Sequence, residues 1–256
     1  MKKILTKAII TDLDRTLLRT DKSVSEYTLD ILQKCRNKGI LIMAASARAA
    51  RDIRIYKDLI GFDAVTSING AVVSLPNDSM EFGIPRESGE KILSGLLHFP
   101  DLFLSVETSN GLYSNRDIPE WKPTVYNDFP RLPEDIVLYK ILASSTQSPL
   151  YDDIENCLTD DVYHTIAKND LIQIMSTDAT KWNGIRYMLS YFGISPEDAV
   201  YFGDDNDDIE PIKKCGLGVA VSNAIVRVLD VADYITDSND LDGVAKFIEK
   251  NLLETE

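Results

Sequence analysis

The sequence has few histidines and cysteines. It holds 2 His and 3 Cys in 256 residues, and Cys35, Cys157 and Cys215 are widely spaced without a CxxC pair. An odd, scattered set of cysteines predicts reduced thiols in a cytoplasmic protein and argues against a structural zinc site. His98 and His164 stand in no catalytic motif, so we expect neither to act in catalysis.

Positive charge is also scarce, because 27 Lys and Arg face 41 Asp and Glu and leave a formal net charge of −14. Nucleic-acid binding relies on clustered Lys and Arg, so we expect no nucleic-acid partner. Long apolar runs are missing too. Near the N-terminus, Lys7 and Asp12 interrupt the apolar stretch before it becomes long. The sequence therefore predicts neither a signal peptide nor a membrane partner. A few local cations can still hold a small phosphorylated ligand.

Strand and helix patterns alternate near both ends of the chain. Continuous apolar runs at 8–11, 40–45 and 64–68 resume at 199–202 and 217–221. Between the first two runs, apolar residues recur at helical spacing, which predicts a helix there. Ser23 and Glu26 predict a capping box at the start of this helix. This rhythm predicts a parallel sheet with helices on both faces.

Hairpin patterns replace this rhythm in the middle of the chain. The apolar stretch 103–107 is followed by Asn110-Gly111, a strong signal for a tight turn between antiparallel strands. We therefore predict an α/β protein whose doubly wound core comprises residues 1–76 and 180–256, with residues 77–179 inserted as an α+β domain.

Two carboxylates stand at the end of the first predicted strand. Asp12 and Asp14 can both reach one cleft where the strand unwinds into a loop, and Thr16 follows as a hydroxyl donor. Ligands of open α/β sheets bind at this edge. Close carboxylates repel each other and favour a hard cation such as Mg²⁺, which suits phosphate chemistry. A solvated acidic turn is the alternative interpretation.

Further polar clusters follow other predicted strands of the core. Ser46 and Arg48 come after the second strand, Lys181 begins a helix, and an acidic loop runs from Gly203 to Asp208. Taken singly, each is explained as an ordinary turn or a solvated surface. The carboxyl ends of parallel strands meet at one edge, however, so we expect the clusters to converge on one site.

Together these motifs resemble those of the haloacid dehalogenase superfamily, in particular its Cof-type sugar-phosphate phosphatases with a large inserted cap. The stretches DLDRTLL, AASAR, ATKWNGIRYML and YFGDDNDD are similar to the four motifs of the family, and SINGA is similar to its linker from core to cap. The resemblance covers essentially the whole chain. It implies that residues 77–179 form the cap.

The resemblance implies a Mg²⁺-dependent phosphatase that acts on a small phosphorylated metabolite through an aspartyl-phosphate intermediate. Asp12 would be the nucleophile, and Asp14 the general acid and base. The metal-site residues would be Asp12, Asp14 through its backbone carbonyl, Asp204 and Asp208, the last of which orients metal-bound waters or Lys181. The phosphate-binding residues would be Ser46, Ala47, Arg48, Lys181 and Asp207.

Three positions depart from the family's pattern. Arg15 and Ala47 stand where the family usually has Gly, and Asp207 stands where it usually has Asn. A carboxylate at 207 would repel a phosphate that an amide could contact. Arg15 and Asp207 therefore leave open a non-catalytic ligand-binding homologue. Two further alternatives stay open on other grounds: a phosphomutase on the same scaffold and a phosphoacceptor module similar to a receiver domain.

Two further expectations concern the cap and the assembly. The aromatic side chains in the irregular stretch of the cap could stack on a sugar or anchor the loop: Trp121, Tyr126 and Phe129. We expect a monomer or a weak homo-oligomer.

Overall fold

The computed structural model describes residues 5–99, 101–145, 154–167 and 171–253. The chain forms two compact units, Met1–Met80 with Thr180–Glu256 and Glu81–Ala179. The first unit extends past residue 76 because strand β5 (Ser79–Glu81) joins its sheet. Among the described residues, none of the helices combines the length and the apolar character that crossing a membrane requires.

The first unit is built on an eight-stranded sheet in the order β14-β13-β12-β1-β2-β3-β4-β5. From β14 to β3 neighbouring strands are parallel, and β4 is antiparallel to β3. From central β1 the chain winds outward through β2 and β3 and later returns to β12 beside β1, so the strand order reverses there. The strands are β1 Ala8–Thr11, β2 Leu41–Ala45, β3 Ala64–Ser67, β4 Val72–Ser74, β12 Ala199–Gly203, β13 Leu217–Val221 and β14 Tyr234–Thr236.

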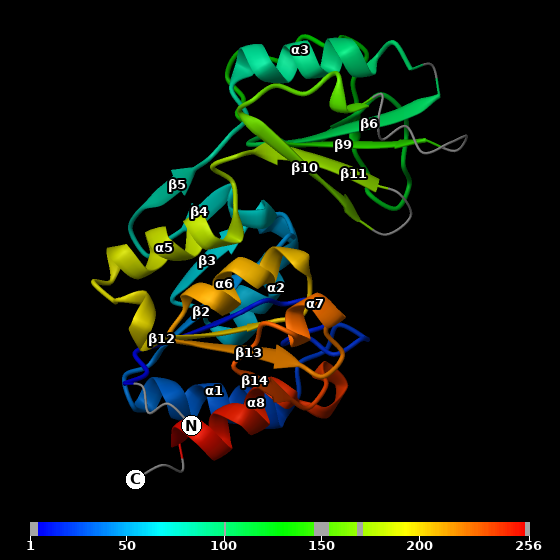
Figure 1. Cartoon of the computed structure of the whole chain (residues 1–256). Coiled ribbons are helices and arrows are strands. Elements are labelled where there is room, and N and C mark those ends of the chain that lie inside the picture. Colours follow the sequence, from blue (N-terminus) through cyan, green and yellow to red (C-terminus); the bar gives the residue numbers. More distant parts are fainter. Residues whose placement is uncertain (1–4, 100, 146–153, 168–170, 254–256) are drawn as a thin grey trace. The chain divides into compact units, whose positions relative to one another are not determined.

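Helices cover both faces of this sheet, with α1 and α8 on one face and α5 and α6 on the other (Figure 1). The predicted doubly wound parallel fold is thus confirmed. The helices are α1 Glu26–Asn37, α2 Ala50–Ile60, α5 Lys181–Tyr191, α6 Ile209–Lys214, α7 Val226–Leu229 and α8 Gly243–Ile248.

The start of α1 differs from the expected capping box. Ser25 is the N-cap, and its hydroxyl accepts a hydrogen bond from the Thr28 N–H. Ser23 instead donates to the carboxylate of Asp21, two residues earlier in the loop. The sequence-based interpretation was wrong because this short polar loop has two serines, and either can satisfy the first free N–H groups of a helix.

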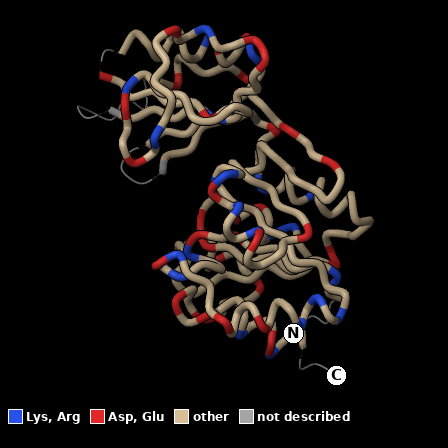
Figure 2. Tube along the Cα trace, turned by 180° about the vertical axis from the view of Figure 1, so that it is seen from behind, with Lys and Arg blue, Asp and Glu red and all other residues tan. Residues whose placement is uncertain are grey.

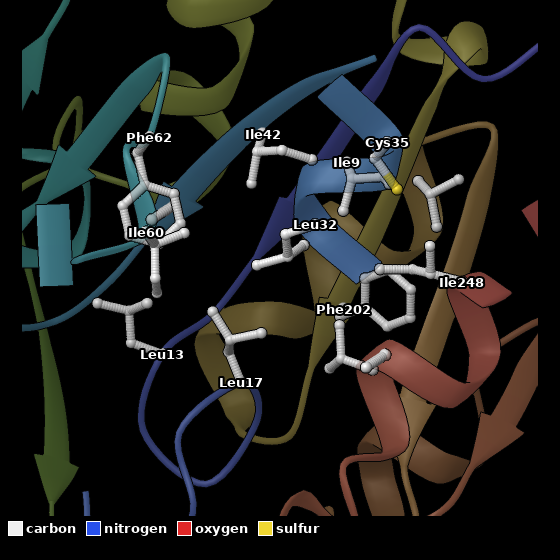
Figure 3. Close-up of a cluster of buried hydrophobic side chains, with 14 of the residues drawn as sticks. Ile9, Leu13, Leu17, Leu32, Cys35, Ile42, Ile60, Phe62, Phe202 and Ile248 are labelled. Carbon is white, nitrogen blue, oxygen red and sulfur yellow. The ribbon is translucent and has the colours of Figure 1, made fainter. Parts of the chain in front are cut away.

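A cluster of buried apolar side chains joins α1 and α8 to the sheet (Figure 3). Ile9 and Ile42 of the central strands, Leu32 of α1 and Ile248 of α8 are buried in it, together with Phe202 of β12. Burying a side chain of this size contributes about 1.5–3 kcal/mol. This packing holds β1 and β12 in place up to their carboxyl ends. Charged residues of both signs are spread along the chain (Figure 2).

The second unit is a six-stranded sheet in the order β10-β11-β9-β6-β7-β8, with helix α3 (Arg86–Leu96) packed on one face (Figure 1). All of its pairs are antiparallel except β7 with β8. The predicted turn at Asn110-Gly111 joins β6 to β7, and Gly111 has a φ of 118°, which favours glycine. The strands are β6 Leu102–Thr108, β7 Gly111–Ser114, β8 Thr124–Val125, β9 Leu138–Ser145, β10 Val162–Ala167 and β11 Leu171–Ser176.

Candidate active site

The sheet places Asp12 and Asp204 side by side. Asp12 follows β1 and Asp204 follows β12, and these two strands are paired in parallel where the strand order reverses. The Asp12 N–H donates to the Phe202 carbonyl over 2.9 Å, which continues the ladder up to the acidic residue. Asp12 is 5% exposed and Asp204 2%. Two carboxylates are therefore held in a buried position at the sheet edge where ligands bind.

Lys181, the first residue of α5, provides the positive charge at this position. Its Nζ donates to Asp12 Oδ1 over 2.8 Å and to Asp208 Oδ1 over 2.6 Å, and lies 3.3 Å from Asp207 Oδ2. Burial lowers the pKa of Lys181, but the three carboxylates outweigh burial and raise the pKa overall. The ammonium group is therefore charged and already positioned against Asp12.

Asp208 accepts hydrogen bonds at both carboxylate oxygens. Besides Lys181, the hydroxyl of Tyr201 donates to Oδ1 over 2.6 Å, and the N–H groups of Asp204 and Asp205 donate to Oδ2 over 2.8 and 3.0 Å. A carboxylate can accept about four such bonds. These four contacts favour a role for Asp208 in orienting Lys181 and the loop after β12.

The acidic residues fit a divalent cation. Carboxylate oxygens of Asp12, Asp204 and Asp208 lie within 4.8 Å of one another. Burial, followed by the neighbouring Asp208, raises the pKa of Asp204 to about 7, and burial also raises the pKa of Asp12 despite Lys181. These buried groups would carry more negative charge than one lysine balances. Hard oxygen donors with excess negative charge suit Mg²⁺.

Asp14 has a separate set of partners. Arg48 donates to its two carboxylate oxygens over 2.5 and 2.8 Å, and Lys22 donates over 2.5 Å. The Arg48 guanidinium also lies 5.2 Å from the ring centroid of Tyr56. Burial raises the pKa of Asp14, but hydrogen bonds from Arg48 and Lys22 outweigh it and lower the pKa to about 2. The guanidinium expected to bind phosphate is therefore bonded to Asp14 in this structure.

Ser46 and Ala47 follow β2. Ser46 is 1% exposed, and its N–H donates to the Thr66 carbonyl over 2.9 Å, so that this N–H extends the sheet. Its hydroxyl accepts from the Arg48 N–H over 3.2 Å, and Ala47 is exposed. We expected Ser46 to bind phosphate, for which a serine can use its hydroxyl and its N–H. With the N–H engaged by the sheet, the hydroxyl is the group that Ser46 can offer.

Sequence reasoning missed the roles of Asn69 and Tyr201. Asn69 donates from Nδ2 to Asp207 Oδ2 over 2.7 Å, from a turn in which Ile68, Asn69 and Gly70 have φ values of 51°, 56° and 107°. A β-branched residue with positive φ is rare, and such strain concentrates at functional sites. In the sequence, the Asn69-Gly70 pair indicates the turn. A tyrosine in an apolar strand indicates that the Tyr201 hydroxyl has a buried hydrogen-bond partner.

The backbone at Arg15 explains why a glycine suits this position. Arg15 has a φ of 61°, in the left-handed region that glycine adopts easily. Its guanidinium donates to the Asn223 carbonyl over 3.1 Å and lies 3.8 Å from Asp204 Oδ2. Arg15 therefore offsets part of the negative charge beside Asp204.

Comparison with known proteins gives the family. A sequence model of haloacid dehalogenase-like hydrolases matches residues 9–248. The 5-amino-6-(5-phospho-D-ribitylamino)uracil phosphatase YitU of Bacillus subtilis (strain 168) is 26% identical over 270 residues, covering 94% of this chain and 96% of its own. The phosphoglycolate phosphatase of Methanopyrus kandleri is 26% identical over 255 residues, covering 98% and 100%.

A solved structure agrees with this result. BT1666 from Bacteroides thetaiotaomicron, described among phosphatases of this superfamily, has a TM-score of 0.83 and 25% identity, covering 96% of this chain and 95% of its own. The match to the family model spans most of the sequence. The chain belongs to the haloacid dehalogenase-like hydrolases, the family that its motifs resemble.

Proposed function

We propose that this hydrolase is a Mg²⁺-dependent phosphatase that removes phosphate from a small metabolite through an aspartyl-phosphate intermediate. The observation that carries the proposal is the buried contact between Lys181 Nζ and Asp12 Oδ1, with Asp204 and Asp208 beside it. Relatives of similar length that are named phosphatases support the reaction type.

Asp12 is the proposed nucleophile. One of its carboxylate oxygens attacks phosphorus and forms the aspartyl phosphate, while the bond from phosphorus to the ester oxygen breaks. Lys181 fixes the orientation of Asp12 through its 2.8 Å hydrogen bond and places positive charge where the phosphoryl oxygens gather negative charge. Mg²⁺ held by Asp12 and Asp204, next to Asp208, would supply the charge that keeps these carboxyl groups ionised.

Asp14 is the proposed acid and base, which protonates the leaving alkoxide and then deprotonates the water that hydrolyses the intermediate. Its ion pairs with Arg48 and Lys22 must loosen before it can take a proton, because together they lower its pKa to about 2. Arg48 must release Asp14 before its Nε and Nη2 groups can bind phosphate. The proposed roles of Asp14 and Arg48 thus depend on opening the same ion pair.

The substrate class is proposed only as a small phosphorylated metabolite, with a sugar phosphate as the first candidate. The relatives named above act on chemically different compounds, an aminouracil phosphate and phosphoglycolate. A cytoplasmic location, a monomer or weak homo-oligomer, and the lack of a nucleic-acid or membrane partner stay predictions.

The test is phosphate release from a panel of sugar and nucleotide phosphates, measured with Mg²⁺ and with EDTA. The proposal expects release that needs the cation, and a rapid-quench sample whose phosphorylated peptide contains Asp12. Transfer of the phosphoryl group back to an isomer of the substrate would instead identify a phosphomutase. A phosphorylated protein that persists for minutes would identify a phosphoacceptor module.

A further inference from the structure

The loop after β1, which carries Asp14, is held by two segments that come much later in the chain. Asn223 follows β13 and Asn239 follows β14, and both strands run parallel to β12 and β1 in the same sheet. The two asparagines stand 208 and 221 positions away from the loop residues that they contact. The carboxyl ends of parallel strands lie at one edge, so these segments can reach the loop of Asp14.

The side-chain amides of these asparagines satisfy carbonyl groups of the loop. Asn223 Nδ2 donates to the Arg15 carbonyl over 2.8 Å, and Asn239 Nδ2 donates to the Leu18 carbonyl over 2.9 Å. Arg15 is the residue after Asp14, and Leu18 forms an isolated parallel β-bridge with Asp14. Both amides therefore act on backbone that adjoins Asp14.

The two asparagines also hold each other. Asn223 Oδ1 accepts from the Asn239 N–H over 2.9 Å, so the oxygen and the nitrogen of its side-chain amide are both engaged. The Asn223 carbonyl accepts in addition from the guanidinium of Arg15 over 3.1 Å. Asn239 is 4% exposed, so water competes little for its hydrogen bonds. The network thus favours one conformation of the loop.

These contacts matter most when the ion pairs of Asp14 open. Arg48 and Lys22 hold its carboxylate in the structure, and the proposed mechanism requires the carboxylate to leave them. The side chain of Asp14 then loses these partners, whereas the carbonyls of Arg15 and Leu18 keep theirs. At that stage the backbone decides whether Asp14 stays within reach of the ester oxygen.

We propose that Asn223 and Asn239 are positioning residues, which hold the backbone beside Asp14 so that its carboxyl group can reach the leaving oxygen. The inference rests on the proposed role of Asp14 as acid and base. Asp12 is fixed by other contacts, from Lys181 and from the ladder with β12. Loss of either asparagine should therefore impair proton donation more than nucleophilic attack, whereas loss of a purely structural residue would slow every ester equally.

The experiment compares two aryl esters of similar shape, phenyl phosphate and p-nitrophenyl phosphate, with Mg²⁺ present. The value of kcat/KM covers the steps in which Asp12 bonds to phosphorus, the ester bond breaks and Asp14 gives its proton to the leaving oxygen. Nitrophenolate leaves readily without that proton, and phenolate does not. The ratio of the two kcat/KM values, taken on one preparation, cancels any change in the folded fraction and reports proton donation.

The variant D14N sets the reference. We expect it to lower kcat/KM for phenyl phosphate at least about tenfold more than for p-nitrophenyl phosphate, because a general acid contributes about 10²–10⁴-fold. N223A and N239A should shift the ratio in the same direction by about threefold or more, because they misplace the acid without removing it. D240A is the matched control. Asp240 accepts from Thr20, farther along the same loop, so D240A should keep the wild-type ratio.

The outcomes separate this inference from the proposed function. Equal losses for both esters in D14N would refute the role of Asp14, and the positioning role would fail with it. A shifted ratio in D14N, together with the wild-type ratio in both N223A and N239A, would overturn the positioning role alone and leave the role of Asp14 intact.

Hydrogen exchange tests the same contact without substrate or metal. The N–H groups of Leu17 and Leu18 donate to carbonyls within the loop, over 3.3 and 2.8 Å. If Asn239 holds this loop, both groups should exchange faster in N239A than in the wild-type protein and D240A. Unchanged exchange in N239A would show that the loop keeps its conformation without the asparagine, which would contradict the inference.

Discussion

Asp12 is fixed by contacts from both its backbone and its side chain. Its N–H belongs to the ladder with β12 and its carboxylate accepts from Lys181. Replacing the carboxylate by an amide of nearly the same shape therefore changes chemistry more than structure. The same carboxylate is proposed as nucleophile and metal ligand. Replacing one of its oxygens by an amide nitrogen therefore removes both functions.

We predict that D12N lowers kcat at least about a hundredfold, a loss of about 2.7 kcal/mol or more of transition-state stabilisation. Steady-state phosphate release measures the effect, and circular dichroism checks the fold. D58N, at an exposed position of α2, is the matched control and should keep the wild-type rate. More than about one per cent of the wild-type rate in purified D12N would show that another group is the nucleophile.

We expect Asp207 to compete with phosphate for Lys181. Its carboxylate lies 3.3 Å from Lys181 Nζ and accepts from Asn69. In D207N the amide oxygen can still accept from Asn69, while the charge on Lys181 becomes available to a dianion. We predict that kcat/KM rises about fivefold, which corresponds to about 1 kcal/mol for one partly screened charge. A lower kcat/KM would mean that Asp207 is needed to position Lys181.

At the scale of elements, the position of α5 decides where Lys181 lies. Gly184, in the first turns of this helix, faces β3 so closely that an added Cβ would be 2.2 Å from Thr66 Oγ1 and 2.8 Å from Thr66 Cβ. The glycine is therefore required by close packing of the helix on the sheet. A shift of the helix away from β3 would also move Lys181, which begins it.

We predict that G184A destabilises the protein by about 1–3 kcal/mol, as overpacking does. Activity should fall further than stability alone explains, because misplacing a catalytic group by about 1 Å can cost about a hundredfold. Urea unfolding and kcat/KM are measured on the same preparations. S190A, an exposed position of the same helix, controls for the change in helix propensity. Wild-type kcat/KM in a folded G184A would contradict this dependence on packing.

At the scale of the whole molecule, the buried carboxylates predict that Mg²⁺ stabilises the folded chain. A cation bound at 100 times its Kd adds about 2.7 kcal/mol of stability, which shifts the unfolding temperature by about 5 °C or more for a chain of this size. Calorimetry with Mg²⁺ and with EDTA measures the shift. D204N should lose it, because Asp204 is one of the three grouped carboxylates. The same shift in D204N would place the cation elsewhere.

Burial by the fold also predicts how the thiols react. Cys35 and Cys215 are free thiols in buried positions, and Cys157 is partly exposed. Burial raises the pKa of Cys35 to about 11 and that of Cys215 to about 12. A raised thiol pKa means that the reactive thiolate is scarce at pH 8, about one part in a thousand or less.

We therefore expect iodoacetamide at pH 8 to label the partly exposed Cys157 in the native protein and to label all three thiols in urea. Raising the pH towards 10 should increase labelling of Cys35 before that of Cys215, as long as the fold persists. Peptide mass spectrometry counts the modified sites. Rapid native labelling of Cys35 or Cys215 at pH 8 would show that the core around that thiol opens.

Much of the fold was predictable because its signals are local. Continuous apolar strands separated by amphipathic helices indicate a parallel sheet, and Asn110-Gly111 marked the hairpin of the second unit. The start of α1 was misplaced because Ser23 and Ser25 can both cap a helix, and only the three-dimensional path of the loop distinguishes them.

The amino-acid sequence by itself determined which chemical groups stand at the carboxyl ends of the strands. Asp12, Asp204 and Lys181 were predicted to converge because parallel strands present their ends at one edge, and the structure brings them together. Tertiary structure alone decided how these groups are paired. Arg48 bonds to Asp14, and Asn69 and Tyr201 join the site, because contacts between residues distant in sequence depend on distances that only the folded chain sets.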